Sequence, residues 1–259
     1  MADYAPQYDL FKIINRLEGV GRFIFWVILV FSIFPIIFKT YCEQEQIIDT
    51  INILNIIGIS LFFCIEIINE FILIPQADNK RRDDFIDNSF GSAFATKNSI
   101  GYYDNDHINQ GLYKTSVNLF ENCFFTYSLV KVTTVSKIII PILMLLTMIV
   151  LAFYGFKEVP FALSVLQALF SANILGTLIK HFILLNRLSQ IQDTWITLFQ
   201  NAEFKTDTIK YEAFVFRYWL QYETLHSKIN AGISESIFKK NNQPLTTAWE
   251  QLKLKYNIS

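Results

Sequence analysis

The chain has 259 residues, of which 52% are hydrophobic and 17% are charged, and its formal net charge is -1. With 25 phenylalanines, this composition is too apolar and too weakly charged for an ordinary soluble domain. The net charge identifies no partner, because the charges are distributed very unevenly along the chain. No small-residue cleavage pattern follows the first apolar run, so we expect no cleaved signal peptide.

The first half of the chain contains two long apolar segments. A helix needs about twenty apolar residues to cross a bilayer, and about seventeen is the usual minimum. The first segment, Phe23 to Phe38, is short, but Arg22 and Lys39 can extend their charged ends to the headgroups. The second fills most of Ile47 to Ile74. It carries Asp49 near its start, Asn52 and Asn55 inside and Glu66 late, so its ends are less sharply defined.

Two further apolar segments, Ile138 to Phe156 and Val159 to Ile179, are long enough to cross a bilayer. We therefore expect an all-α polytopic membrane protein with four transmembrane helices in two hairpins and a helical cytoplasmic region. The expected division is a cytoplasmic N-terminal arm at 1–22, hairpin 1 at 23–75, a helical cytoplasmic insertion at 76–136, hairpin 2 at 137–180 and a helical cytoplasmic tail at 181–259.

The basic residues near the ends of the spans predict the orientation, because Lys and Arg favour the cytoplasmic side. They concentrate in the arm, the insertion and the start of the tail, as Lys12, Arg16, Arg22, Lys80, Arg81, Arg82, Lys97, Lys114, Lys131, Lys137, Lys180 and Arg187. Each of the two remaining connections carries one Lys. We therefore expect both termini and the insertion to face the cytoplasm. Cys42, Cys64 and Cys123 are too scattered for a disulfide framework or a metal cluster.

The cytoplasmic parts are expected to be helical. Residues 77–88 can continue the second span as a helix that stops near Gly91, and 112–132 can lead into the third span, with turns between them at Gly101 and 104–106. The tail starts with one buried helical face, formed by Ile183, Leu184, Leu188, Ile191, Trp195, Leu198 and Phe199. An aromatic helix over 207–231 follows, and its rings must pack on other helices or on a neighbouring subunit. A short last helix, 245–254, is expected after Pro244.

Small residues recur every fourth position in the fourth span. They form a ridge of Ser164, Ala168, Ala172 and Gly176 that continues to Lys180. Small residues let helix backbones approach closely in lipid. The ridge indicates either packing within one subunit or a subunit interface or pore wall, while snorkelling alone explains Lys180.

Polar residues inside the second span need a partner or water. Glu66 either faces a bundle interior or, if the span ends early, lies at the interface. Asn52 and Asn55 can bond between helices or line a polar path, and interhelical bonding is the preferred interpretation. His226 lies among aromatic residues, which favours a packed side chain.

The densest charged motif is Ala77 to Gly91. Lys80 and Arg81 have the spacing to pair with Asp84 in a local salt-bridge network on a helix surface. Alternatively, three basic residues bind a phosphate-bearing ligand whose base stacks on one of two tyrosines; these candidates are Lys80, Arg81, Arg82, Tyr102 and Tyr103. Contact with anionic lipid is a further alternative.

Several acidic residues and His107 follow this motif, but no metal-binding motif joins them. The sequence also contains no Gly-rich phosphate loop, nucleophile elbow or Cys/His pair. We therefore expect no enzyme, no metal and no cofactor.

At the run Arg81 to Gly91, followed by Tyr102–Tyr103 and Glu121–Asn122, the chain resembles small four-span membrane effectors of bacterial anti-phage loci. These effectors, of the SMODS- and SLOG-associated four-helix type and the Hailong type, are paired with nucleotidyltransferases. The resemblance implies that a partner enzyme makes a nucleotide or oligonucleotide signal, that the cytoplasmic part binds it, and that a homo-oligomer then depolarises the membrane as an ion channel or pore in abortive infection. The alternatives are a non-conducting membrane scaffold that recruits a partner and, less favoured, a lipid-modifying membrane enzyme.

Overall fold

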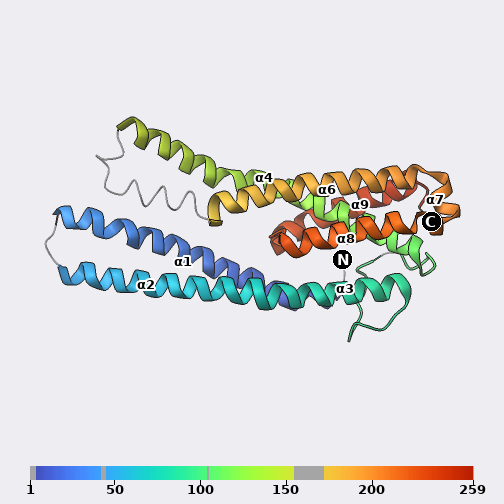
Figure 1. Ribbon diagram of the computed structural model, residues 1–259, viewed down its shortest axis with the longest axis horizontal. Helices are drawn as coiled ribbons and strands as arrows, with labels where there is room; N and C mark the ends of the chain where they lie inside the picture. The colour runs from blue at the N-terminus through green and yellow to red at the C-terminus, as the bar shows by residue number, and fades with distance from the viewer. Residues whose placement is uncertain (1–3, 42–44, 104, 155–171, 259) are drawn as a thin grey trace. The chain divides into compact units, whose positions relative to one another are not determined.

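The computed structural model describes residues 4–41, 45–103, 105–154 and 172–258. Within these ranges the chain is helical and has no strand, which confirms the all-α prediction; Tyr4 and Ile100 form an isolated antiparallel bridge. The elements in Figure 1 are α1 Tyr8–Tyr41, α2 Glu45–Ile67, η1 Ile68–Leu73, α3 Ile74–Phe90, α4 Leu112–Tyr154, η3 Ala172–Gly176, α6 Thr177–Gln200, α7 Ala202–Thr206, η4 Thr208–Tyr211, α8 Glu212–Lys228 and α9 Glu235–Lys255.

The chain divides into two compact units. The apolar unit comprises Lys12–Ile74 and Val135–Ile179. The polar unit comprises Met1–Phe11, Pro75–Thr134 and Lys180–Ser259. Helices α1 and α4 contribute residues to both units.

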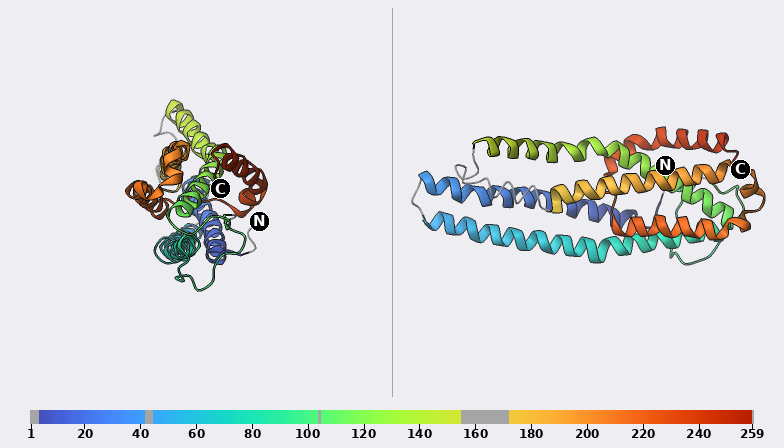
Figure 2. Two further views of the ribbon diagram at one scale, coloured as in Figure 1. Left: turned by 90° about the vertical axis from the view of Figure 1, so that its right-hand side faces the viewer. Right: turned by 45° about the horizontal axis from the view of Figure 1, so that its top comes forward.

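In the apolar unit, α1 and α2 lie side by side, as Figures 1 and 2 show. They approach closely at Gly58, where an added Cβ would lie 3.2 Å from Cγ1 of Ile28. The rings of Phe25 and Phe62 also meet across this pair of helices, with their centroids 6.2 Å apart. A small residue at the crossing permits this close contact, as is typical of helices that pack in lipid.

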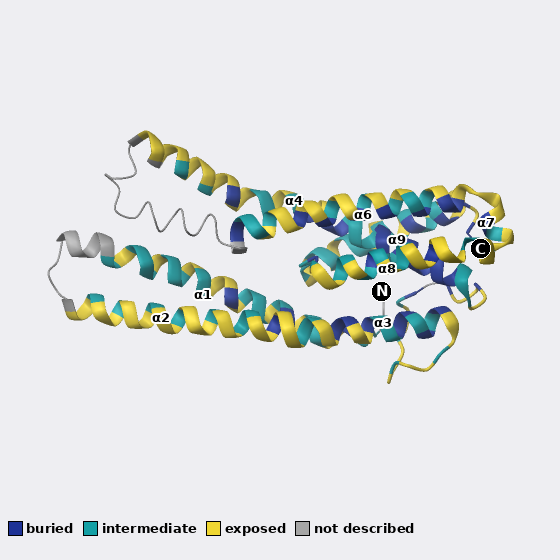
Figure 3. Cartoon of the chain, viewed as in Figure 1, coloured by how far each residue is buried: buried dark blue, intermediate teal, exposed yellow. Residues whose placement is uncertain are grey.

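Three helices in the described part of the chain are long and apolar enough to cross a membrane. They lie within Tyr8–Pro35, Gln46–Phe90 and Leu112–Val150, and only 6%, 0% and 11% of their most apolar windows are buried. Figure 3 colours most of α2 and of the second half of α4 as exposed or intermediate. The predicted fourth span, Val159–Ile179, begins outside the described residues, so the count of four spans stays a prediction.

Helical structure continues without a break from α2 through η1 into α3. The segment η1 is a π-helix, in which the backbone N–H of Ile74 donates to the carbonyl of Asn69, five residues earlier. Pro75 follows directly, and its ring removes one backbone donor, which a widened turn accommodates. Helix α3 ends before Gly91, whose φ of +72° is the left-handed conformation that favours glycine after a helix. The predicted continuation of this helix to near Gly91 is confirmed.

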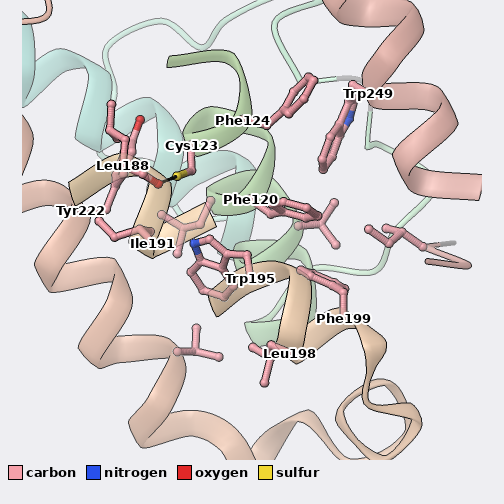
Figure 4. Close-up of a cluster of buried hydrophobic side chains, with 14 of the residues drawn as sticks. Phe120, Cys123, Phe124, Leu188, Ile191, Trp195, Leu198, Phe199, Tyr222 and Trp249 are labelled. Atoms are coloured by element: carbon pink, nitrogen blue, oxygen red, sulfur yellow. Dashed lines mark hydrogen bonds between the residues drawn. The ribbon is translucent and has the colours of Figure 1, made fainter. Parts of the chain in front are cut away.

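The polar unit has a core of large aromatic and aliphatic side chains. Phe120 of α4 is fully buried, with its ring centroid 5.4 Å from that of Phe199 on α6 and 5.2 Å from that of Trp249 on α9 (Figure 4). The predicted buried face of α6 is confirmed at Leu184, Leu188, Ile191, Trp195, Leu198 and Phe199. It is wrong at Ile183, which is 47% exposed.

The tail helices differ from the prediction at their ends. The aromatic helix α8 is shorter than the predicted 207–231, because a short 3₁₀ turn precedes it. Helix α9 begins at Glu235, ten residues before the predicted start, and Pro244 lies inside it. The hydroxyl of Ser234 caps this helix by accepting the backbone N–H of Ile237, so the start signal lies before the proline.

Both ends of the described chain are tied to the polar unit. Tyr4 pairs with Ile100, and the ammonium of Lys97 lies 4.0 Å from the centre of the Tyr4 ring. At the other end, the ammonium of Lys205 donates to the carbonyl of Tyr256. Each terminal segment therefore takes part in the tertiary structure.

Candidate functional site

On α3, Asp78 lies three residues before Arg81 and four before Arg82. Residues three and four apart share a face of a helix, and no glycine interrupts α3 before Gly91. Asp78 and Arg81 are buried and Arg82 is half-buried. Arg81 and Arg82 belong to the predicted phosphate-binding set of Lys80, Arg81, Arg82, Tyr102 and Tyr103.

Glu223 of α8 closes this cluster. Arg81 donates from both terminal nitrogens to the two oxygens of Glu223, at 3.1 and 2.6 Å, and Arg82 donates from Nε at 2.9 Å. Asp78 lies 3.7 Å from Arg81 Nε and 3.8 Å from an Arg82 terminal nitrogen. The charges of two guanidinium groups and two carboxylates therefore balance in this partly buried site. We call these four residues, Asp78, Arg81, Arg82 and Glu223, the arginine cluster.

The electrostatics of the arginine cluster stabilise the charged forms of Arg81 and Glu223. Burial alone would lower the pKa of Arg81, but the charge and hydrogen bonds of Glu223 raise it above its ordinary value. Burial alone would raise the pKa of Glu223, but Arg81 and Arg82 bring it below its usual range. Burial and the charge of Arg81 lower the pKa of His226 to about 3, so this imidazole is neutral near pH 7. Its ring lies 4.7 Å from that of Tyr222, and its buried Nε2 has no hydrogen-bond partner in the structure.

Two further acidic residues of α3, Asp84 and Asp87, hold the loop that follows it. The carboxylate of Asp87 accepts the backbone N–H groups of Phe94 and Ala95, both at 2.8 Å, and Asp84 accepts that of Ser99 at 2.6 Å. The backbone N–H donors offset burial and lower the pKa of Asp87. The expected pairing of Lys80 and Arg81 with Asp84 is therefore wrong. Asp84 faces the loop, and the arginines turn to Asp78 and Glu223.

The two tyrosines of the predicted ligand site pack in the interior. Tyr103 is 4% exposed, its ring lies 6.3 Å from that of Phe85, and its hydroxyl accepts a hydrogen bond from Asn122 at 3.2 Å. Tyr102 is half-buried and meets Tyr103 edge-on at 4.8 Å. Burial raises the pKa of both phenols. Lys80 is exposed, so the predicted set comprises a buried cluster and one surface ammonium.

A buried amide network lies at the start of α4. The amide of Asn105 donates to Asn118 at 2.9 Å and to the carboxylate of Glu121 at 2.7 Å, and Asn118 donates to Asn88 at 2.9 Å and Ser89 at 3.2 Å. These contacts join the loop after α3 to both α3 and α4. Sequence reasoning marked 105 only as a turn position and missed the network.

In the apolar unit the predicted polar residues contact neighbouring helices. The amide of Asn55 donates to the hydroxyl of Ser32 at 3.1 Å, which is the expected interhelical hydrogen bond. Glu66 is half-buried and faces α1, where one of its oxygens would lie 3.9 Å from a Cβ added at Gly21. Both side chains therefore contribute to the packing of α1 against α2.

The ridge of small residues is only partly described. Ser164 and Ala168 lie outside the described residues. Ala172 and Gly176 begin and end the π-helix η3, and Lys180 is exposed on α6. The proposed packing or pore role of this ridge stays a prediction.

Sequence reasoning missed Glu223, the residue that organises the arginine cluster. It lies 142 residues from Arg81, so no local spacing relates the two. The signal available in the sequence is a carboxylate between Tyr222 and His226 on an aromatic helix. A half-buried acid in such surroundings needs a basic partner.

Among the described residues, no three His, Cys, Asp or Glu side chains gather closely enough to hold a metal ion. A surface depression of about 460 Å³ lies beside the start of α4 and includes His107, Lys205 and Asn257 in its lining. The predicted ligand residues do not line it.

Comparison with known proteins yields no relative. No family model, no curated protein and no solved structure matches the chain. The function of the chain is therefore inferred from its own residues.

Proposed function

We propose that the chain is a membrane effector that oligomerises and opens a pore or ion channel when a phosphate-bearing signal binds its polar unit. The observation that carries the membrane part is the near absence of burial along three long apolar helices. Apolar side chains exposed over whole helices need lipid or further subunits to cover them.

The arginine cluster supports the ligand part of the proposal. Two guanidinium groups directed at one acceptor match the several oxygens of a phosphate. Lys80, exposed one position before Arg81, adds a point charge that can attract an anion from solution.

Helical continuity offers a route from ligand to membrane. Arg81 lies on α3, which continues α2 through the π-helix η1, and α4 contributes to both units. π-segments occur frequently at functional sites. For gating, the ligand must bind the conducting state more tightly than the resting state. Several subunits are also required, because four helices of one chain pack without leaving a wide pore.

The resemblance at Arg81 to Gly91 supplies the biological context of the proposal. The signal is then a nucleotide or oligonucleotide made by a partner nucleotidyltransferase, and opening depolarises the bacterial inner membrane in abortive infection. Both termini and the polar unit are cytoplasmic in this arrangement.

The ion pairs within the arginine cluster favour a second candidate, a non-conducting membrane scaffold. Arg81 and Arg82 already have a carboxylate partner, as in a purely structural ion pair. In this case α8, with Phe214 and Phe216 partly exposed, recruits a cytoplasmic partner.

Flux through vesicles separates the two candidates. The full chain is reconstituted into liposomes loaded with K⁺, and efflux is followed with a potential-sensitive dye before and after addition of the product mixture of a nucleotidyltransferase. Efflux that requires both protein and nucleotide supports the effector, and an R81E/R82E variant that still inserts and assembles is expected to lose the response. The absence of efflux from the wild-type protein under all nucleotide mixtures would favour the scaffold.

A further inference from the structure

The carboxylate of Glu223 occupies the place where an anionic ligand of the arginine cluster would bind. Its two oxygens accept hydrogen bonds from both terminal nitrogens of Arg81 and from Nε of Arg82, at 2.6 to 3.1 Å. A guanidinium fork presents the same two parallel donors to a carboxylate and to a phosphate. A phosphate that binds these donors must therefore displace Glu223.

The surrounding contacts make this displacement consequential. Glu223 lies on α8 and both arginines lie on α3, so the pair joins two helices. The other prominent contact between them is aromatic, with Trp219 5.3 Å from Phe85 and stacked at 6.3 Å on Phe90. Loss of the ion pair would leave α8 attached to α3 by these rings.

The charges also favour exchange of one anion for another. Asp78 stays beside both arginines at 3.7 and 3.8 Å, so it neutralises part of their charge whether or not Glu223 is present. A departing Glu223 becomes hydrated, and an incoming phosphate offers more acceptor oxygens than the carboxylate it replaces. A buried pair that loses one partner is strongly destabilised, so the arginines need an anion in either state.

We propose that Glu223 is an internal competitor that holds the resting state, and that a phosphate-bearing ligand activates the protein by displacing it from Arg81 and Arg82 and so breaking the ion pair that joins α8 to α3. This inference rests on the proposed function and adds its regulation. It assigns the ligand class as an anion with at least two terminal phosphate oxygens that can replace a bidentate carboxylate.

Pyrophosphate binding to the full chain in a phosphate-free maltoside detergent tests the proposal. Affinity is measured by calorimetry for the wild-type protein and for Glu223→Gln, which keeps the shape of the side chain and removes its charge. The expected result is at least tenfold tighter binding by E223Q, because the ligand no longer competes with a carboxylate. The matched control is Glu203→Gln, an exposed carboxylate of the same unit that pairs with Lys210, and it should bind as the wild type does.

A second variant covers the case in which E223Q does not fold. Glu223→Asp keeps the charge but withdraws the carboxylate by one methylene, which weakens its two-pronged contact, and a gain of at least threefold is expected. Unchanged or weaker binding by folded E223Q would overturn the proposal. Failure of both variants to fold would also overturn it, since the pair would then be required by the fold itself.

The outcomes distinguish this inference from the proposed function. Binding that R81E/R82E abolishes but E223Q leaves unchanged rejects the role of Glu223 and keeps the arginine site. No pyrophosphate binding by the wild type, E223Q or E223D, with all three folded, rejects the arginine site as well.

Discussion

Removing the ring of Phe120 should destabilise the polar unit more than any surface change of similar size. The side chain is fully buried and its ring meets those of Phe199 and Trp249. Deleting a buried Phe side chain costs about 3–5 kcal/mol, which includes the loss of aromatic pairs worth about 0.5–1.5 kcal/mol each. At roughly 2–4 °C per kcal/mol for a unit of this size, Phe120→Ala should lower the apparent Tm by about 10 °C.

Intrinsic fluorescence of the full chain in detergent, followed during heating, measures this effect. Trp249 is a direct reporter, because its indole is buried against Phe120 and Phe124. The control is Leu254→Ala on the same helix as Trp249, at a side chain that is 77% exposed, and its Tm should change by about 2 °C or less. If the two variants melted within about 2 °C of each other, the assignment of Phe120 to the core would be wrong.

Three further changes test other parts of the polar unit and the helix that enters it. Gly91→Ala should lower the Tm, because position 91 has φ of +72° and an added Cβ would lie against a side chain. The control, Gly19→Ala, places a Cβ in open space on a helix, so its Tm should stay unchanged or rise slightly. Equal shifts of Tm for the two variants would contradict this. Asn118→Asp should lower the free energy of unfolding by about 2–4 kcal/mol, because it removes two donated hydrogen bonds and buries a second carboxylate near Glu121. In thermal melts at neutral pH, its Tm should fall further than that of Asn118→Ala. The folded pKa of His226 is about 3 and its ordinary value is 6.5, so the unfolded chain takes up the proton first and stability falls as the pH drops below 6.5. His226→Phe should flatten the dependence of Tm on pH between 6.5 and 5, and an unchanged slope would locate the titrating group elsewhere.

Local periodicity predicted much of the helical structure. The recurrence of apolar residues every three or four positions identified six buried residues of α6, and Gly91 marked the end of α3. The prediction that Ile183 is buried was wrong, because this residue lies beside the buried stripe and is 47% exposed. The predicted start of α9 was wrong because proline often occupies the first turn of a helix. Here Pro244 lies inside the helix, which begins after its cap at Ser234.

Within the arginine cluster, the sequence predicted only residues that α3 contributes. The sequence places Arg81 and Arg82 next to each other on one predicted helix, but it cannot show which acids contact them. Asp84 was the expected local partner, yet backbone donors of the following loop claim its carboxylate. Glu223 arrives from a helix 142 residues away, and only the tertiary fold of the polar unit brings it to Arg81.

The anchoring of both chain ends limits how the protein can be fused or immobilised. Tyr4 pairs with the loop at Ile100, Tyr8 donates to Glu235 at 2.8 Å, and Ile258 is 7% exposed. A reporter protein joined directly at either end would pull on the helices and loop that surround the amide network and the aromatic core. Long flexible spacers are therefore required for reporters and surface attachment alike, and an internal label on the exposed face of α9 would perturb the molecule less than a terminal one.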